Sequence, residues 1–339
     1  MTHEWHHIWQ HYLEHRNTVR FALASVVFLE GSSYRRPGVR MLIGEGGQRI
    51  GAVSGGCVEK EVERQCEQVF RDGKPKMMQY DGRYRLGCEG VLHLLLEPFS
   101  PAEKSIEKLS LSFDQRLPFS LKSYYSQDLQ TPTGLGTYWS IGEEEYALSE
   151  FAQKGEAGLF EENLLPRPRL LVFGGEHDAV VLTQMAKSLG YEIGVFTDPK
   201  EGKQLTDFPG ADAHEHWVSE QPLAGSTWRP DPQTAVVVMS HNFARDLAFL
   251  GVLGEEKFSY LGILGPAHRR EKLSAALFDH FPEISYDFPE RWNAPAGLDL
   301  GGENASEIAL SILSEILKLN RGYSGLSLKD KSGRIHGEG

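Results

Sequence analysis

The hydrophobic residues of the first 98 positions are spaced as in short strands around one amphipathic helix. β-Branched and aromatic residues predict strands at 19–29, 39–43, 49–53, 76–80 and 91–97. Between the third and fourth of these strands, hydrophobic residues recur at the three- to four-residue spacing of a helix, namely Val58, Val62, Cys66 and Val69. A further helix is predicted at about 3–16. The pattern therefore indicates an N-terminal α+β domain.

The pattern from Arg169 onward alternates short buried strands with amphipathic helices. The predicted strands lie at 169–173, 191–197, 235–239 and 260–264, and the last helix at 306–317. This alternation is typical of a parallel sheet covered on both faces. We therefore predict an α/β protein whose parts are an N-terminal domain at 1–98, an antiparallel appendage and linker at 99–165, a Rossmann-like parallel-sheet domain at 166–320 and a loose tail at 321–339.

Composition narrows the class of protein and its partners. A hydrophobic content of 40% and a charged content of 24% are ordinary for a soluble globular protein. No apolar run reaches the roughly 18 residues of a membrane span, and the three cysteines are too few for a disulfide framework. The net charge of −12 argues against a nucleic-acid partner. We expect a cytoplasmic protein that binds neither membrane nor nucleic acid.

The stretch Ser54-Gly55-Gly56-Cys57-Val58-Glu59 joins a predicted strand to a predicted helix. The unpaired N–H groups and the dipole of a helix start attract anions, and they lower the pKa of a cysteine placed there. Cys57 is thus a candidate for a reactive or metal-binding sulfur. The structural alternative is a tight glycine turn in which Cys57 packs as a small apolar residue.

A second cysteine, Cys88, also lies in a glycine turn, whereas Cys66 falls on the apolar stripe of the predicted helix. We therefore assign Cys66 to the core. Cys88 follows Cys57 by 31 positions, which does not match the spacing of a structural zinc site. A ligand cleft shared by these two sulfurs is the remaining hypothesis.

The turn after the strand at 169–173 has the layout of a dinucleotide-binding fold. Gly174 and Gly175 precede the helix, and Asp198 follows the next strand, 24 positions after Gly174. Glu176 stands where the motif has its second glycine, and a carboxylate there repels a diphosphate. The sequence thus supports the Rossmann architecture more strongly than it supports NAD(P) binding.

Ligands of open α/β sheets bind at the carboxyl ends of the strands. Polar candidates at these ends are His177, Asp178, His241, Asp246, His268, Arg269 and Arg270. Arg269 and Arg270 could bind a phosphate through paired hydrogen bonds. They could equally cover the solvent-facing start of a helix.

The N-terminal helix carries histidines at four-residue spacing, namely His3, His7, His11 and His15. The segment from His3 to His7 matches the H-E-x-x-H pattern of zinc proteases, but it lies at a chain end and has no evident third ligand. We expect a solvated histidine face, with a weak metal site at His7 and His11 as the alternative.

The motifs taken together resemble a known family. They are, in chain order, Gly31-Ser32-Ser33, Pro37-Gly38, the stretch 54–59, the Cys88 turn, the Rossmann half, His241, Asp246 and Ala294-Pro295-Ala296-Gly297-Leu298-Asp299. Their succession resembles the xanthine dehydrogenase accessory factor family, XdhC/CoxI. The family's Gly-Gly-Cys-x-Glu falls on Gly55, Gly56, Cys57 and Glu59.

The resemblance implies a non-catalytic chaperone that binds the molybdenum cofactor (molybdopterin). It implies sulfuration of the cofactor by a cysteine desulfurase and insertion into a xanthine-dehydrogenase-type molybdenum hydroxylase. The residues that it places at the site are Gly55, Gly56, Cys57, Glu59 and Cys88, and we expect Cys57 and Cys88 to be the metal ligands. Together with the candidates from the glycine turn and the strand ends, the predicted cofactor-binding residues are Ser54, Gly55, Gly56, Cys57, Glu59, Cys88, Gly174, Gly175, His177, Asp178, Asp198, His241, Asp246 and Arg269. A homodimer is one oligomeric form that we consider.

Three alternatives stay open from the residues themselves. Glu59 could accept hydrogen bonds from pterin N–H groups or only stabilise the helix start. An NAD(P)-dependent oxidoreductase would place Asp198 on the ribose hydroxyls. A hydrolase would use Ser54 as its nucleophile, although no histidine and acid follow in a recognisable context.

Overall fold

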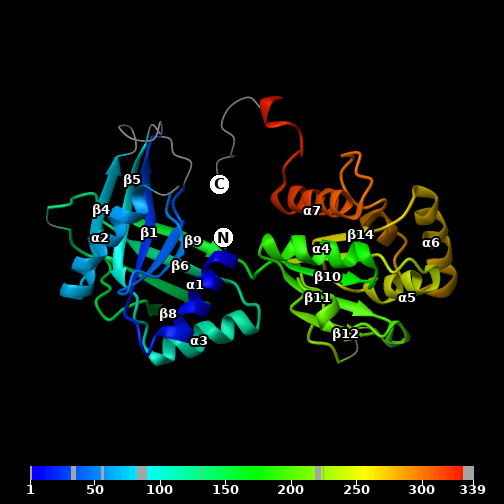
Figure 1. Cartoon of the computed structure of the whole chain (residues 1–339), viewed down its shortest axis with the longest axis horizontal. Helices are drawn as coiled ribbons and strands as arrows, with labels where there is room; N and C mark the ends of the chain where they lie inside the picture. The colour runs from blue at the N-terminus through cyan, green and yellow to red at the C-terminus, as the bar shows by residue number, and fades with distance from the viewer. Residues whose placement is uncertain are drawn as a thin grey trace. The chain divides into compact units, whose positions relative to one another are not determined.

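The structure is a computed structural model that describes residues 2–31, 36–54, 57–81, 90–130, 132–217, 223 and 225–330, without the side chain of Cys57. The chain divides into two compact units, Met1–Pro166 and Arg167–Gly339 (Figure 1). None of the helices in the described part of the chain is long and apolar enough to span a membrane.

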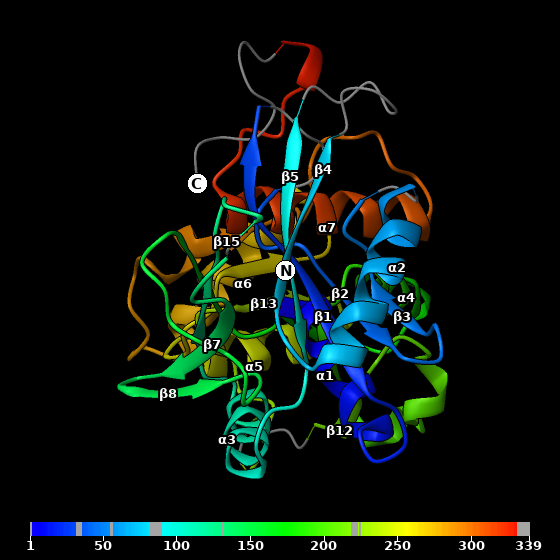
Figure 2. The same ribbon diagram turned by 90° about the vertical axis from the view of Figure 1, so that its left-hand side faces the viewer.

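An antiparallel five-stranded sheet organises the first unit. Its strands, in spatial order, are β3 (Arg49–Gly51), β2 (Arg40–Gly44), β1 (Phe21–Glu30), β5 (Val91–Pro98) and β4 (Lys76–Asp81). Helix α2 (Cys57–Asp72) lies along one face of this sheet (Figure 2). Its apolar stripe is Val58, Val62, Cys66 and Val69, fully buried against β1, β2 and β5. Burial of this stripe fixes where the helix begins relative to the sheet.

The other face of this sheet packs on a second layer. That layer holds α1 (Thr2–His15), α3 (Glu103–Asp114) and an antiparallel sheet of β8 (Glu144–Ala147), β7 (Gly136–Ile141), β6 (Phe119–Tyr124) and β9 (Leu159–Leu164). Trp5, Trp9, Tyr12 and Phe99 stack edge-to-face or tilted in the shared core. The residues after 98 therefore complete the first unit's core.

The second unit is a six-stranded parallel sheet. Its spatial order is β12 (Ala213–His216), β11 (Glu192–Thr197), β10 (Arg169–Phe173), β13 (Thr234–Val238), β14 (Tyr260–Ile263) and β15 (Trp292–Asn293). Helices α4 (His177–Ser188) and α7 (Ala305–Arg321) pack on one face, and α5 (Phe243–Leu253) and α6 (Ala267–His280) on the other. Numbered within the unit, the strand order is 3-2-1-4-5-6, which is that of the Rossmann fold.

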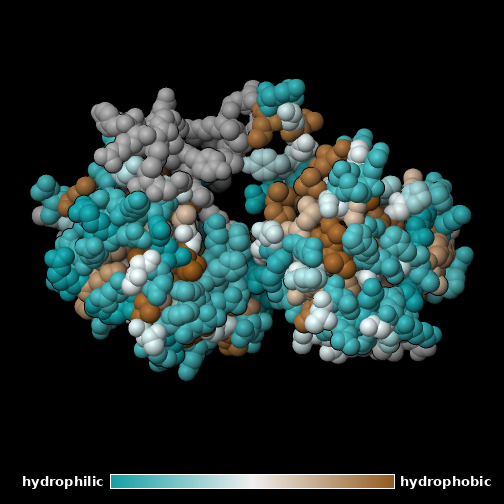
Figure 3. All heavy atoms as spheres, in the orientation of Figure 1, coloured by the Kyte–Doolittle hydropathy of each residue, from teal (hydrophilic) through white to brown (hydrophobic). Residues whose placement is uncertain are grey.

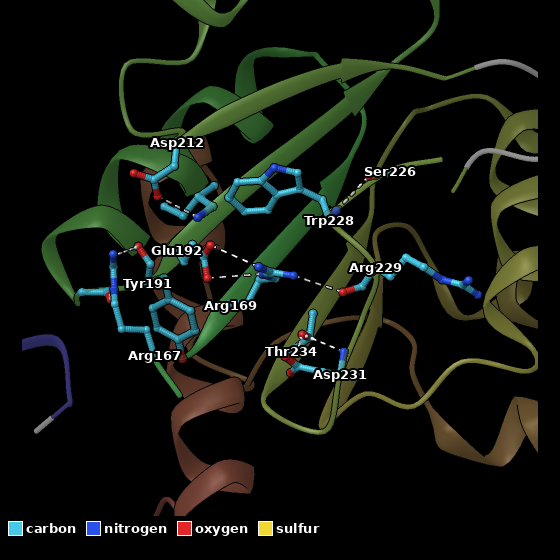
Figure 4. A network of polar contacts seen from close by, with 12 residues as sticks. Arg167, Arg169, Tyr191, Glu192, Asp212, Ser226, Trp228, Arg229, Asp231 and Thr234 are labelled. Atoms are coloured by element: carbon cyan, nitrogen blue, oxygen red, sulfur yellow. Dashed lines mark hydrogen bonds and ion pairs between the residues drawn. The ribbon is translucent and has the colours of Figure 1, made fainter. Parts of the chain in front are cut away.

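The amino edge of this sheet is held by a satisfied polar network around Arg169 (Figure 4). The buried guanidinium donates to both carboxylate oxygens of Glu192, at 3.1 and 3.3 Å, and to the backbone oxygen of Arg229 at 3.1 Å. It also lies 4.7 Å from the ring centroid of Trp228. Arg167 donates to the backbone oxygen of Tyr191 at 3.0 Å, so this edge anchors the chain where the second unit starts.

The predicted fold class is confirmed, an N-terminal antiparallel α+β part followed by a Rossmann-like parallel sheet. Several elements were not predicted, namely α3, β8, β9, β12 and β15. Helix α7 also runs further than its predicted end at residue 317. Exposed leucines gather over α7 and the segment that follows it, including Leu310, Leu317, Leu326 and Leu328 (Figure 3).

Candidate functional site

The start of α2 is shaped by a buried contact between Ser54 and Glu59. The Ser54 backbone N–H donates to Glu59 Oε1 at 2.7 Å, and the Ser54 hydroxyl lies 3.0 and 3.1 Å from the two carboxylate oxygens. Both residues are buried, with Glu59 only 5% exposed. A carboxylate in the first helical turn that accepts a preceding N–H stabilises a helix start, as in a capping box. The carboxylate of Glu59 thus ties Ser54 to the first turn of α2.

This contact bears on the two roles that the sequence left open for Glu59. Its carboxylate is engaged in stabilising the turn, which favours the structural role. The other predicted residues here, Gly55, Gly56, the side chain of Cys57 and Cys88, lie outside the described residues, as do Ser32 and Ser33 of the upstream motif. The predicted pairing of the two sulfurs therefore stays a prediction.

The assignment of Cys66 to the core is confirmed. Its side chain is fully buried among the apolar residues of α2 and the five-stranded sheet. Burial raises the pKa of this thiol to about 12. A thiol that stays protonated at neutral pH is a poor nucleophile and a poor metal ligand.

The remaining predicted residues lie on or just after the carboxyl edge of the second unit's parallel sheet. The chain reverses direction across the sheet between β10 and β13, so the loops after these two strands flank the switch point at which such folds bind ligands. Gly174 follows β10 with φ of 139°, and a Cβ there would lie 2.5 Å from the backbone oxygen of Met239. Only glycine fits this close approach between the two loops.

His241 and Asp178 face each other across the switch point. His241 Nε2 lies 3.7 Å from Asp178 Oδ2, and the histidine side chain is 50% exposed. His241 has φ of 54°, a left-handed conformation that is uncommon for residues other than glycine. Strained residues of this kind cluster at functional sites, and this one presents an imidazole at the surface.

Asp246 links the loop after β13 to α6. Its Oδ1 accepts the Ser240 hydroxyl at 2.5 Å and the Ser240 backbone N–H at 3.2 Å, and its Oδ2 accepts Arg269 Nη2 at 2.7 Å. Asp246 is 1% exposed, so its charge is compensated by these donors. Asp246 is therefore a buried positioning group for the loop, and Arg269 is engaged with it.

Asp198 is paired with Arg245 at 3.0 Å, and the same guanidinium pairs with Glu201. Desolvation raises the pKa of Glu201; Arg245 opposes the rise, while Glu176 and Asp198 add to it. Glu176 follows the two glycines, and the carboxylate of Glu201 lies beside Gly175. An acidic turn with its ribose-binding position already paired gives no support to a bound nicotinamide dinucleotide.

Two helices begin at this edge without a side-chain cap. The N-cap residues Glu176 of α4 and Pro266 of α6 make no side-chain cap hydrogen bond, whereas Asn242 caps α5 through Arg245 N–H. Gly175 and His177 lie at the start of α4, the first buried and the second exposed. First-turn N–H groups that lack a side-chain cap can receive polar ligand atoms.

The eight cofactor-binding residues predicted in the second unit all lie at or next to one edge of the sheet. Sequence reasoning missed Glu201, Arg245 and Ser240, which complete the two polar clusters there. Ser240 and Glu201 follow strand ends, and Arg245 lies in the first turn of α5. All three would have been found by including, besides residues at the carboxyl ends of the strands, those in the first turn of the following helix.

Comparisons with known proteins agree with this architecture in both halves. A model described as the XdhC Rossmann domain matches residues 170–316, and one for the XdhC and CoxI family matches residues 15–81. A crystal structure of a xanthine dehydrogenase from Bacillus halodurans shares the fold, with a TM-score of 0.76 at 23% identity over 93% of this chain and 96% of that one.

Two curated relatives are similar over nearly their whole length. The chain is 29% identical over 320 residues to a probable xanthine dehydrogenase subunit from Bacillus subtilis (strain 168), covering 88% of this chain and 93% of the relative. It is 26% identical over 334 residues to the molybdenum cofactor insertion chaperone PaoD of Escherichia coli (strain K12), covering 92% and 91%. Models of XdhC proteins thus match both units, and the chain is similar to these two relatives over about nine tenths of its length.

Proposed function

We propose that this chain binds the molybdenum cofactor and delivers it to a xanthine-dehydrogenase-type molybdenum hydroxylase. The observation that carries the proposal is the end-to-end similarity to the chaperone PaoD, supported by family models in both units. A cofactor chaperone needs a binding surface and a releasable ligand rather than a complete set of catalytic groups. The alternative oxidoreductase lacks support because Asp198 is paired with Arg245.

We assign the cofactor to the start of α2. The observation behind this assignment is that a short strand, β3, leads into the start of α2, since phosphate groups bind at helix N-termini. The bound group would supply molybdenum and sulfur chemistry. Cys57 and Cys88 are the proposed ligands of the metal or of its sulfur, since thiolates suit soft partners.

The carboxyl edge of the second unit is the proposed second cofactor surface. It offers His241 and Asp178, together with the helix start that follows Gly175. We further propose that a cysteine desulfurase supplies the sulfur of the cofactor, and that the chain works as a homodimer. The sulfur donor is proposed from the family resemblance. Its binding to this chain and the self-association of the chain would each have to be measured.

The cofactor assignment is tested by replacing Cys57. We expect Cys57→Ala, purified from a molybdate-fed host, to contain about a tenth of the parent's molybdenum and pterin, or less. The reason is that loss of a ligand weakens metal affinity by about tenfold or more. Cys66→Ala is the matched control, because it also removes a thiol but lies in the core. Equal molybdenum and pterin contents in Cys57→Ala and the parent would reject the assignment.

The role of Glu59 is tested separately. Glu59→Gln keeps the size of the side chain but loses one acceptor for Ser54, so we expect a helix start destabilised by about 1 kcal/mol. If Glu59 only positions the turn, Ser54→Ala and Glu59→Gln lower cofactor retention to a similar degree. A much larger loss with Glu59→Gln would instead indicate a direct contact with the pterin.

A further inference from the structure

The N-terminal helix carries a histidine cluster that the proposed cofactor chemistry does not use. Histidines at 3, 7, 11 and 15 follow one side of α1, because residues four apart are neighbours on a helix. The opposite side is fixed in the core by Trp5, Ile8, Trp9 and Tyr12. The histidines therefore project from a helix whose position is set by packing.

Their side chains converge at only one end of the described helix. His11 and His15 stack with ring centroids 4.3 Å apart and planes 25° apart, whereas the rings of His3 and His7 are 6.4 Å apart and nearly perpendicular. One ligand atom from each of His11, Glu14 and His15 lies within 4.8 Å of the other two. The predicted pair His7 and His11 is thus not the pair that the structure favours.

The hydrogen bonds of this cluster leave ring nitrogens for coordination. His15 Nδ1 lies 3.0 Å from the backbone oxygen of His11, and since a carbonyl only accepts, Nδ1 carries the proton. Nε2 of His15 then has a free lone pair, the arrangement by which metal-binding histidines are oriented. Nε2 of His11 is buried and has no hydrogen-bond partner among the described residues.

We propose that His11, Glu14 and His15 form a binding site for a divalent transition-metal ion, with Zn²⁺ as the probe. Two imidazoles and a carboxylate are a donor set that zinc accepts, with bonds of about 2.0–2.2 Å and hence ligand atoms roughly 3.3 Å apart. The ligand atoms lie within 4.8 Å of one another, and rotation of the exposed side chains of Glu14 (72%) and His15 (39%) can bring them closer. At present Glu14 Oε2 lies 3.9 Å from Nδ1 of His15, so the Glu14 side chain must rotate toward Nε2. Three protein ligands leave one position open to water or to a partner's ligand.

A ring contact restrains His11 on the helix. The ring of His11 lies edge-to-face on Phe21, with centroids 5.8 Å apart. This contact holds one ligand in place.

The site is tested on the full-length chain after removal of metals with a chelator. Zn²⁺ is titrated by calorimetry, and Co²⁺ absorption reports imidazole coordination. We expect His15→Ala and Glu14→Gln to weaken Zn²⁺ binding at this site, His15→Ala by about tenfold or more. We expect His7→Ala, an exposed histidine one turn away, to leave binding unchanged.

Thermal unfolding provides the second readout, since an ion that binds only the folded chain raises its Tm. We expect Zn²⁺ to raise the Tm of the parent and of His7→Ala but not that of His15→Ala. Equal Zn²⁺ affinity and equal Tm rise in His15→Ala and the parent would overturn the proposal, as would a loss of binding in His7→Ala equal to that in His15→Ala. Neither result depends on molybdenum cofactor content.

Discussion

A buried acid in the first unit makes its stability depend on pH near neutrality. Glu97 on β5 is fully buried, and its carboxylate accepts the Thr137 N–H at 2.8 Å and the Thr137 hydroxyl at 2.5 Å. Burial raises its pKa to about 7, with the Thr137 hydrogen bonds and then the charge of Arg40 opposing the rise. Between pH 4.5 and about 7, Glu97 is therefore mostly protonated in the folded chain and mostly ionised in the unfolded chain.

The sign and size of the effect follow from these two pKa values. Below pH 4.5 the group is protonated in both states, and its contribution to stability is fully present. As the pH rises from 4.5 to about 7 the unfolded chain releases the proton first, so stability is lost progressively. At about 1.36 kcal/mol per pKa unit, the loss is of the order of 3 kcal/mol.

The assay compares the parent with Glu97→Gln between pH 4.5 and 8. Urea unfolding is followed by hydrogen-exchange mass spectrometry of peptides from β6 and β7, which report the first unit separately from the second. We expect the parent to lose about 3 kcal/mol over this range relative to Glu97→Gln, because glutamine does not ionise. Glu150→Gln, which removes an exposed carboxylate, should follow the parent. Parallel pH profiles for Glu97→Gln and the parent would refute the reasoning.

The other predictions concern groups in both units. Asp246→Asn leaves Arg269 without its carboxylate partner and should destabilise the second unit by about 3 kcal/mol, measured by urea unfolding, and an unchanged midpoint would contradict the buried pairing. Arg169→Lys loses the two-pronged contact with Glu192 and should lower stability by about 1–3 kcal/mol in the same assay. Cys66 should resist alkylation until the chain unfolds, which peptide mapping checks; labelling of native protein would show that its core is open.

The sequence predicts best those elements whose buried side chains are mostly hydrophobic. Strands β1, β5, β10 and β13 are mostly hydrophobic, although β5 also buries His93 and Glu97, and α2 buries a stripe of valines and Cys66. Helix α3 was missed because its buried side includes Ser105 and Ser112, whose hydroxyls bond Trp139 Nε1 and the backbone oxygen of Leu117. Serines on a buried face weaken the periodicity on which prediction depends. β12 is a polar edge strand, and β15 has only two residues.

The candidate site was predictable in location more than in arrangement. A strand end is recognisable from sequence, so His241 and Asp198 could be placed at the sheet edge. Their partners could not, because the pairing of Asp198 with Arg245 depends on the spatial order of strands and on side-chain rotamers. For the same reason the four-residue spacing on α1 does not say that His15, rather than His7, stacks on His11.

The two units share one structural feature: a serine that follows a strand donates hydrogen bonds to a carboxylate near the start of the next helix. In the first, a serine after β3 donates its N–H and its hydroxyl to Glu59 in the first turn of α2; in the second, Ser240 makes the same two donations to Asp246 in α5. Both carboxylates are buried, so each requires these donors and would be costly to leave unpaired. In the second unit the contact joins Ser240 to Asp246, and the His241 side chain between them is half exposed. A candidate binding residue such as His241 can then keep a strained backbone conformation, because a buried contact made by its neighbours stabilises the loop.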